Sequence, residues 1–123
     1  MLGLPVNSSV PTAFEVSRAL SIAAFLGYGV TCLTTTHMVA EFERFGLARF
    51  RRTVGLLEVL GALGLLASYW YRPLLLPAAG GLTLLMLLGV GTRLRLRDSA
   101  AETAPAALFC VMNGFIFWYA LQA

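Results

Sequence analysis

One acidic residue of this 123-residue chain lies inside an apolar run, about one helical turn from the start of the run. Glu58 is flanked by Leu57 and Val59, and no other charged residue occurs between Arg52 and Arg72. A carboxyl group among apolar side chains is costly to bury, so it normally has a partner or a function. Glu58 is therefore the first candidate for chemistry, as a group that handles a proton or binds a polar ligand.

Two further side chains could act together with Glu58. His37 and Arg93 lie at the ends of apolar runs, close to the same boundary as Glu58 if these runs are antiparallel helices. One hypothesis is a proton- or ligand-handling site formed by all three residues. The alternative is a structural Glu58–Arg93 ion pair that fixes helix register near a boundary, where water and snorkelling reduce the cost of both charges. A lone histidine such as His37 is also typical of a polar helix end.

Asn113 is a polar residue near the middle of the last apolar run, and it predicts either an inter-helix hydrogen bond or a binding role.

The two cysteines, Cys32 and Cys110, both lie in apolar runs, without a CxxC pair or a Cys/His cluster. The sequence therefore predicts no metal site and no disulfide scaffold. A dithiol is conceivable only if the helices that carry these two residues touch. No catalytic group of residues is recognisable, which favours a protein that is not an enzyme.

The composition indicates what must position these residues. The chain is 59% hydrophobic and only 12% charged, whereas a soluble domain has about 25% charged residues. Because so few charges cannot cover a water-exposed surface, most of the surface must face lipid. The nine basic residues are all arginines, and they cluster at the ends of apolar runs. We interpret them as a membrane-topology signal rather than a nucleic-acid surface. A chain without lysine that is rich in Ala, Leu and Gly also suggests GC-rich codon usage and a bacterial source.

Four apolar runs approach the length of about 20 residues that a helix needs to cross a bilayer. Their approximate bounds are 16–38, 54–71, 74–92 and 105–121. Since the later connections are short, neighbouring helices should run antiparallel. The sequence predicts an all-α fold, a four-helix up-and-down bundle that forms a single transmembrane domain over residues 1–123.

The arginines also predict the orientation of the bundle. Seven lie in the two connections that follow the first and third runs: Arg44, Arg49, Arg51, Arg52, Arg93, Arg95 and Arg97. Only Arg18 and Arg72 fall at the other face. The positive-inside rule then places both arginine-rich loops in the cytoplasm and both termini outside, in a bacterial cytoplasmic membrane. The aromatic clusters 69–71 and 117–119 would lie at the outer interface, as an aromatic belt does.

The connection after the first run has an amphipathic pattern. Val39, Phe42, Phe45 and Phe50 alternate with charged residues at spacings that suit one helix face. We expect an amphipathic helix that lies in the cytoplasmic interface. The alternative is a polar loop with incidental aromatic residues.

Small residues indicate how the helices pack. The first run carries one every four residues, and the second and fourth runs carry shorter series: Ala19, Ala23, Gly27, Thr31 and Thr35; Gly61, Gly64 and Ser68; Ala106, Cys110 and Gly114. Lipid tails are as apolar as leucine, so close packing at small residues holds membrane helices together. We expect all three series to lie at helix contacts inside the bundle.

Two stretches of the sequence resemble the DoxX-like family: residues 41–47 with Arg51-Arg52 and 55–66, and residues 78–93 with Pro105-Ala106. The resemblance covers roughly residues 20 to 121. It implies four transmembrane helices and an association with membrane oxidoreductase systems, including quinone-linked sulfur oxidation and thiol-oxidative stress complexes. Some relatives resemble assembly factors. The family's glutamate in the second helix corresponds to Glu58, whereas Arg93 stands where many members carry a histidine.

Three functions compete on these grounds. The leading hypothesis is a non-catalytic accessory or scaffold subunit that docks by its apolar faces to a larger membrane complex or to further copies of itself. The second is a quinone- or lipid-binding component of a membrane oxidoreductase system, with Glu58 and Arg93 at the site and quinone as the cofactor. The third is a small oligomeric transporter, which is disfavoured because four helices leave little room for a pore and no inverted repeat is visible.

Overall fold

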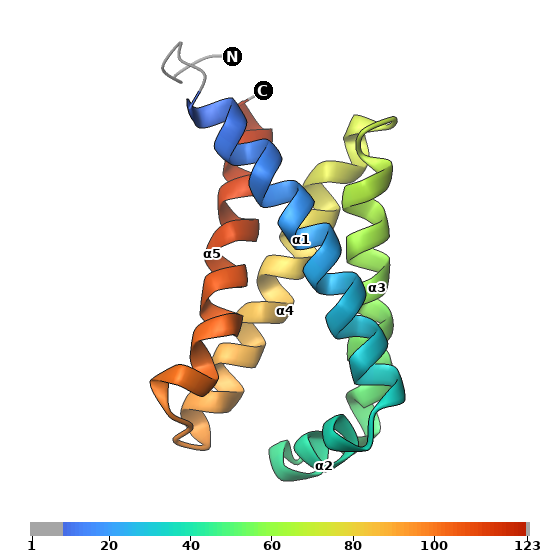
Figure 1. Ribbon diagram of the computed structural model, residues 1–123, viewed down its shortest axis with the longest axis vertical. Helices are drawn as coiled ribbons and strands as arrows, with labels where there is room; N and C mark the ends of the chain where they lie inside the picture. Colours follow the sequence, from blue (N-terminus) through green and yellow to red (C-terminus); the bar gives the residue numbers. More distant parts are fainter. Residues whose placement is uncertain (1–8, 123) are drawn as a thin grey trace.

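The computed structural model describes residues 9–122, and it is built from helices. Their bounds are α1 Ser9–Thr34, α2 Thr36–Phe45, α3 Arg51–Ala67, α4 Leu75–Arg95 and α5 Ala100–Gln122, with short 3-10 turns η1 at Ala48–Phe50 and η2 at Arg72–Leu74. The four long helices run up and down beside one another, and α2 crosses one end of the molecule (Figure 1). Both ends of the described chain lie at the other end. The predicted all-α class is confirmed.

Three of the helical segments are long and apolar enough to cross a membrane. They are Val10–Thr34, Arg72–Arg95 and Ala100–Gln122, which correspond to the first, third and fourth apolar runs. Helix α3 corresponds to the second run and has 17 residues. At 1.5 Å per residue it is about 26 Å long, slightly less than the roughly 30 Å of a hydrocarbon core.

The first apolar run, predicted as one segment over 16–38, is divided at Thr35. This residue is extended, with φ −96° and ψ 145°, and its hydroxyl accepts a hydrogen bond from the Met38 backbone N–H to cap α2. At the C-terminal end of α1, the Arg51 guanidinium donates to the carbonyls of Cys32 and Leu33, at 2.8 and 3.1 Å. Helix ends leave unpaired backbone groups, and here side chains satisfy several of those groups. The chain can therefore turn, and α2 lies across the end of the bundle.

We call the end that α2 crosses the arginine end, because the seven arginines of the two connections lie there: Arg44, Arg49, Arg51, Arg52, Arg93, Arg95 and Arg97. Helix α1 packs mainly on α3, and α4 mainly on α5. The two pairs meet near the termini, where the rings of Phe14 and Tyr119 stack with centroids 4.2 Å apart. From there the pairs diverge toward the arginine end (Figure 1).

Small residues mediate the contacts of α4, as predicted. An added Cβ at Gly61 would meet the Leu82 side chain, and one at Gly64 would meet the Ala78 side chain, so α3 and α4 approach closely at these positions. On the other side of α4, the Cys110 thiol of α5 donates to the Thr83 carbonyl at 3.7 Å. Such close approaches are expected in a membrane, where the hydrophobic effect does not drive helices together and close packing at small residues does.

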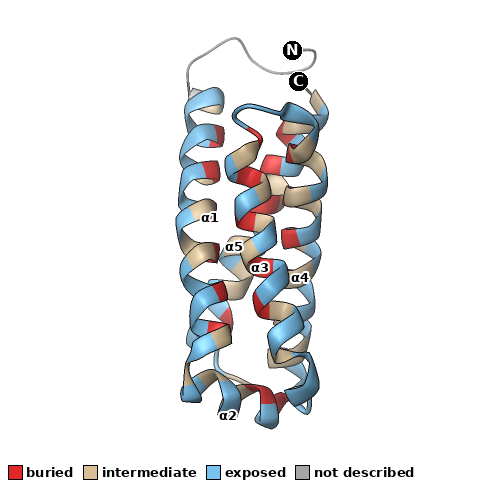
Figure 2. Ribbon diagram, turned by 90° about the vertical axis from the view of Figure 1, so that its right-hand side faces the viewer, coloured by how far each residue is buried: buried red, intermediate tan, exposed pale blue. Residues whose placement is uncertain are grey.

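The small-residue series of α1 faces outward, so the prediction that it packs inside the bundle is wrong. Four of its members, Ala19, Ala23, Gly27 and Thr31, are exposed, as the pale outer face of α1 shows in Figure 2. The buried face of α1 instead carries Phe14, Arg18, Ser21, Phe25, Gly29 and Cys32. Bulky rings on that face fill the space toward α5, which turns the small residues away from the bundle.

Two apolar clusters form the interior. The larger one lies among the four long helices and includes Phe25, Leu65, Leu82 and Ile116. The smaller one lies at the arginine end, where Phe42 and Phe45 of α2 pack with Cys32 of α1. A helix, α2, therefore forms in the predicted amphipathic segment and buries Phe42 and Phe45, whereas Val39 of the predicted apolar face is exposed. Phe50, beyond that helix, is exposed.

Candidate functional site

Glu58 lies on the buried face of α3, between the two apolar clusters. That face presents Gly55, Glu58, Ala62 and Leu65 to the interior. About one turn before Glu58, toward the arginine end, an added Cβ on Gly55 would stand 3.3 Å from the Cys32 Cβ, so α1 and α3 approach closely there. After Glu58, toward the other end of α3, Ala62 and Leu65 belong to the larger cluster. Only 8% of the surface of Glu58 is exposed.

The carboxyl group of Glu58 has no hydrogen-bond partner among residues 9–122, and its Oε2 atom is fully buried. A buried polar atom without a partner costs about 1–3 kcal/mol. The predicted ion pair between Glu58 and Arg93 is absent from the described part of the chain, because Arg93 pairs with other carboxylates. The structure thus places Glu58 as an isolated buried acid, and its role in proton or ligand handling stays a prediction.

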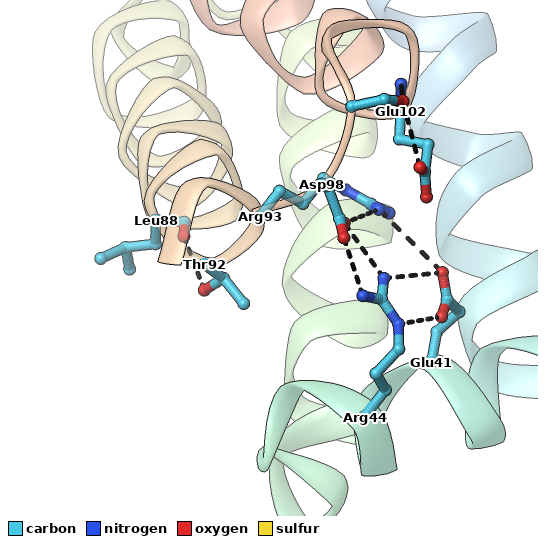
Figure 3. Close-up of polar contacts among 8 residues, drawn as sticks. Glu41, Arg44, Leu88, Thr92, Arg93, Asp98 and Glu102 are labelled. Atoms are coloured by element: carbon cyan, nitrogen blue, oxygen red, sulfur yellow. Dashed lines mark hydrogen bonds and ion pairs between the residues drawn. The ribbon is translucent and has the colours of Figure 1, made fainter. Parts of the chain in front are cut away.

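Arg93 belongs to an ion-pair network at the arginine end, formed by Glu41, Arg44, Arg93 and Asp98 (Figure 3). Arg44 lies between the two carboxylates, with its Nε 2.8 Å from Glu41 and its Nη1 2.8 Å from Asp98. Arg93 donates to Asp98 at 3.1 Å and approaches Glu41 at 4.0 Å. Two of these residues come from α2, one from the end of α4 and one from the following turn. The network therefore joins α2 to the α4–α5 connection.

The geometry of the network favours full ionisation. Arg44 contacts both oxygens of Asp98, at 2.8 and 3.1 Å, in the paired arrangement that suits a guanidinium and a carboxylate. Hydrogen bonds from Arg44 hold the pKa of Asp98 and the pKa of Glu41 below their usual values. The same bonds raise the pKa of Arg44 above its usual value. The carboxylates of Glu41 and Asp98 and the guanidinium of Arg44 are therefore charged at neutral pH.

The turn after α4 is shaped to present Asp98 to α2. Arg97 has φ 59°, which is the single positive φ of a non-glycine residue among residues 9–122. The Asp98 backbone N–H then donates to the Arg93 carbonyl at 3.0 Å, which closes the turn. A left-handed conformation costs roughly 1–2 kcal/mol in a residue with a Cβ. A second link runs from Arg95, which donates to the Phe45 carbonyl of α2 at 2.7 Å.

The structure does not bring His37 and Asn113 to Glu58. His37 is exposed in the first turn of α2. Asn113 is fully buried in α5, and its Nδ2 donates to the Ser21 hydroxyl of α1 at 3.3 Å and to the Phe109 carbonyl at 2.9 Å. The inter-helix hydrogen bond predicted for Asn113 is thus present. No group of three His, Cys, Asp or Glu residues in the described chain could hold a metal ion.

Among the described residues, the buried cation is Arg18, which lies near the end of the bundle that carries the termini. Its guanidinium lies 3.8 Å from the centroid of the Tyr69 ring and donates to the Ser68 hydroxyl at 3.2 Å. It also pairs with Glu15 one turn earlier. These contacts fasten α1 to the end of α3. Sequence reasoning missed this link, because its partners lie 50 positions away along the chain.

The DoxX-like family model matches residues 16–115. This chain belongs to the DoxX-like family. Searches of curated proteins and of solved structures gave no match. Family membership and three long apolar helices together identify this DoxX-like protein as an integral membrane protein.

Proposed function

We propose that this DoxX-like protein is a non-catalytic accessory subunit that docks to a larger membrane complex through the outer face of α1. The observation that carries the proposal is the exposed ridge of α1, formed by Ala19, Ala23, Gly27 and Thr31. Small residues at four-residue spacing let a second helix approach the backbone, which is how helices associate in lipid. Among residues 9–122 these four ridge residues remain exposed.

The ridge is suited to close contact because it leaves no polar group in need of a partner. The Thr31 hydroxyl donates to the Gly27 carbonyl of its own helix at 2.8 Å. An added Cβ at Gly27 would meet nothing within 4 Å. A partner helix could therefore seat against Gly27 without displacing a side chain of this protein.

In the membrane we place α3 as a fourth span and α2 in the cytoplasmic interface. Arginines at the start of α3 and aromatic residues after its end mark the two boundaries that a short span needs. Trp70, which is 80% exposed, would lie at the outer interface with Trp118 of α5. The arginine end would then face the cytoplasm and both termini the outside, in the cytoplasmic membrane of a bacterium.

Two leucine substitutions at exposed glycines test the docking proposal. Gly27→Leu puts bulk on the ridge of α1, and Gly81→Leu puts the same bulk on the outer face of α4, where an added Cβ also meets nothing within 4 Å. Each tagged variant is purified from its native membrane in mild detergent, and the stoichiometry of copurifying proteins is measured. We expect Gly27→Leu to lose a stoichiometric partner that wild type and Gly81→Leu retain.

The oligomeric state of Gly27→Leu distinguishes a second copy of this chain from a different protein as the partner. If the partner is a second copy of this chain, Gly27→Leu converts a homo-oligomer into a monomer. If all three proteins purify as monomers in mild detergent and in native nanodiscs, the docking proposal is wrong.

A second candidate function is a quinone- or lipid-binding component of a membrane oxidoreductase system that uses Glu58. The burial of this acid without a partner among residues 9–122 favours it, since an intramembrane ionisable residue is a functional candidate. The engagement of Arg93 with Asp98 and Glu41 weighs against Arg93 as a ligand of the same site. Glu58→Gln should abolish quinone-dependent turnover in membranes while the purified variant keeps the helical content of wild type. Full turnover in that variant would remove this candidate.

A further inference from the structure

Helix α2 connects the two diverging helix pairs through side chains. Its backbone packs on α1, on η1 and on α3. It reaches the α4–α5 connection mainly by long polar groups: Arg44 contacts Asp98, and Arg95 contacts the Phe45 carbonyl. One apolar side chain of the connection, Leu96, also packs against the cluster of Phe42 and Phe45. The polar contacts can break without unpacking a helix from its neighbours.

The helix covers a thiol and lies close to the buried acid. Phe42 and Phe45 pack against Cys32, which is 1% exposed. The Cys32 thiol donates to the Arg51 carbonyl at 3.4 Å. Glu58 lies one turn further into the bundle than Gly55, the glycine that faces Cys32. Helix α2 thus supplies side chains that cover Cys32 at the arginine end, together with Leu47, Val54 and Leu96.

Both ends of α2 have residues suited to a hinge. Thr35 is a single extended residue between α1 and α2. Gly46 follows α2 in the left-handed region, with φ 75°, where glycine is the favoured residue. Hinges of moving elements are a few residues at element ends that absorb changes in backbone angles. Helix α2 could therefore swing as a rigid unit.

We propose that α2 is a latch, which the ion-pair network of Glu41, Arg44, Arg93 and Asp98 holds closed over Cys32 and the approach to Glu58. Release of the network lets α2 lift from the α4–α5 connection and admits water between the helix pairs at the arginine end. The structure shows the closed state. The latch does not depend on docking through the α1 ridge, which lies on the outer face of α1.

The native cysteines report on the latch. Purified protein in nanodiscs is treated with a water-soluble maleimide, and labelling of Cys32 and Cys110 is followed separately by peptide mass spectrometry.

Two variants, Arg44→Gln and Asp98→Asn, each remove the ion pair between Arg44 and Asp98 that joins α2 to the α4–α5 connection. Glu43→Gln is the matched control, because Glu43 is an exposed acid of α2 outside the network. We expect Cys32 to be labelled roughly 1.5- to fivefold faster in both latch variants, as for the loss of an ion pair near the protein surface. Cys110 and the control variant should be unchanged.

A salt titration of wild type keeps the test decisive if a variant fails to fold. Raising the ionic strength from 0.1 M to 1 M shortens the Debye length from about 10 Å to about 3 Å, which weakens exposed charge pairs. Cys32 labelling in wild type should then rise severalfold at high salt, while Cys110 labelling stays constant. Equal Cys32 labelling in wild type and folded latch variants overturns the proposal, as does a flat salt response. A parallel rise at Cys110 overturns it too, because the whole bundle would then have loosened.

Discussion

Gly61 is a position where one added methyl group should strongly disturb the packing of α3 on α4. An ideal Cβ at Gly61 would stand 2.5 Å from Cδ2 and 2.6 Å from Cγ of Leu82. Leu82 is 1% exposed and lies in the larger apolar cluster, so its side chain has little free space to enter. Its Cγ is a branch point rather than a flexible end. In Gly61→Ala, α3 and α4 must therefore move apart.

The magnitude follows from the cost of overpacking. Extra methylenes in a well-packed interior cost about 1–3 kcal/mol, and we expect Gly61→Ala to fall in this range. Gly81→Ala is the matched control, because its added Cβ meets nothing within 4 Å. Leu82→Ala alone should cost about 2–5 kcal/mol through the cavity that it leaves. In the double variant the new methyl group occupies part of that cavity, so the combined cost should be smaller than the sum.

The assay is unfolding in mixed micelles with increasing denaturing detergent, followed by the fluorescence of Trp70 and Trp118. The double-mutant cycle should give a coupling free energy of at least about 0.5 kcal/mol, as for residues in contact. Strict additivity, or a Gly61→Ala variant as stable as Gly81→Ala, would refute the argument that α3 and α4 are closest at this glycine.

Three further predictions concern the stability of the bundle, the first two measured by the same unfolding assay. Arg18→Met should lower the unfolding midpoint, because it removes the buried link from α1 to the end of α3, whereas Glu15→Gln at its half-exposed partner should change little. Arg51→Gln should also destabilise, because two carbonyls at the end of α1 lose their donor. Stability should fall on acidification, because the pKa of Asp98 is held below its usual value. A carboxylate with a lowered pKa contributes stability above its unfolded pKa of about 4 and loses it as pH falls through the folded value. Thermal unfolding at pH 7 and pH 3 measures this loss, which should be smaller in Arg44→Gln.

The long helices could be predicted because their signals are local. Apolar runs, the short connections between them and the clusters of arginine and aromatic residues are all readable within a few residues. The contacts of Gly61 and Gly64 with α4 were also predictable, since small residues are expected where membrane helices touch. The break at Thr35 was missed, because threonine at an N-cap looks the same in sequence as threonine inside an apolar helix.

The direction in which the α1 ridge faces and the ion-pair network depend on the tertiary fold. A period of four marks Ala19, Ala23 and Gly27 as a helix face, but it does not decide whether that face meets the same chain or another one. The residues of the network carried a partial signal, since Glu41 and Arg44 are three positions apart on one helix. Their contact with Asp98 could not be read, because Arg44 and Asp98 are 54 positions apart.

Arg93 pairs with Asp98 rather than with Glu58, and this difference limits the roles that Glu58 can have. Arg93 lies in the last turn of α4, where its long side chain reaches carboxylates at the surface of the arginine end. A bond to Glu58 would instead require the guanidinium to leave water, and desolvation of both charges can exceed the attraction between them. The interpretation of Glu58 as one half of a register-fixing pair with Arg93 therefore loses its support. A buried carboxyl whose cost no described side chain offsets fits a functional group better than a structural one. In the second function proposed above, a ligand of Glu58 would therefore approach from the arginine end of the bundle.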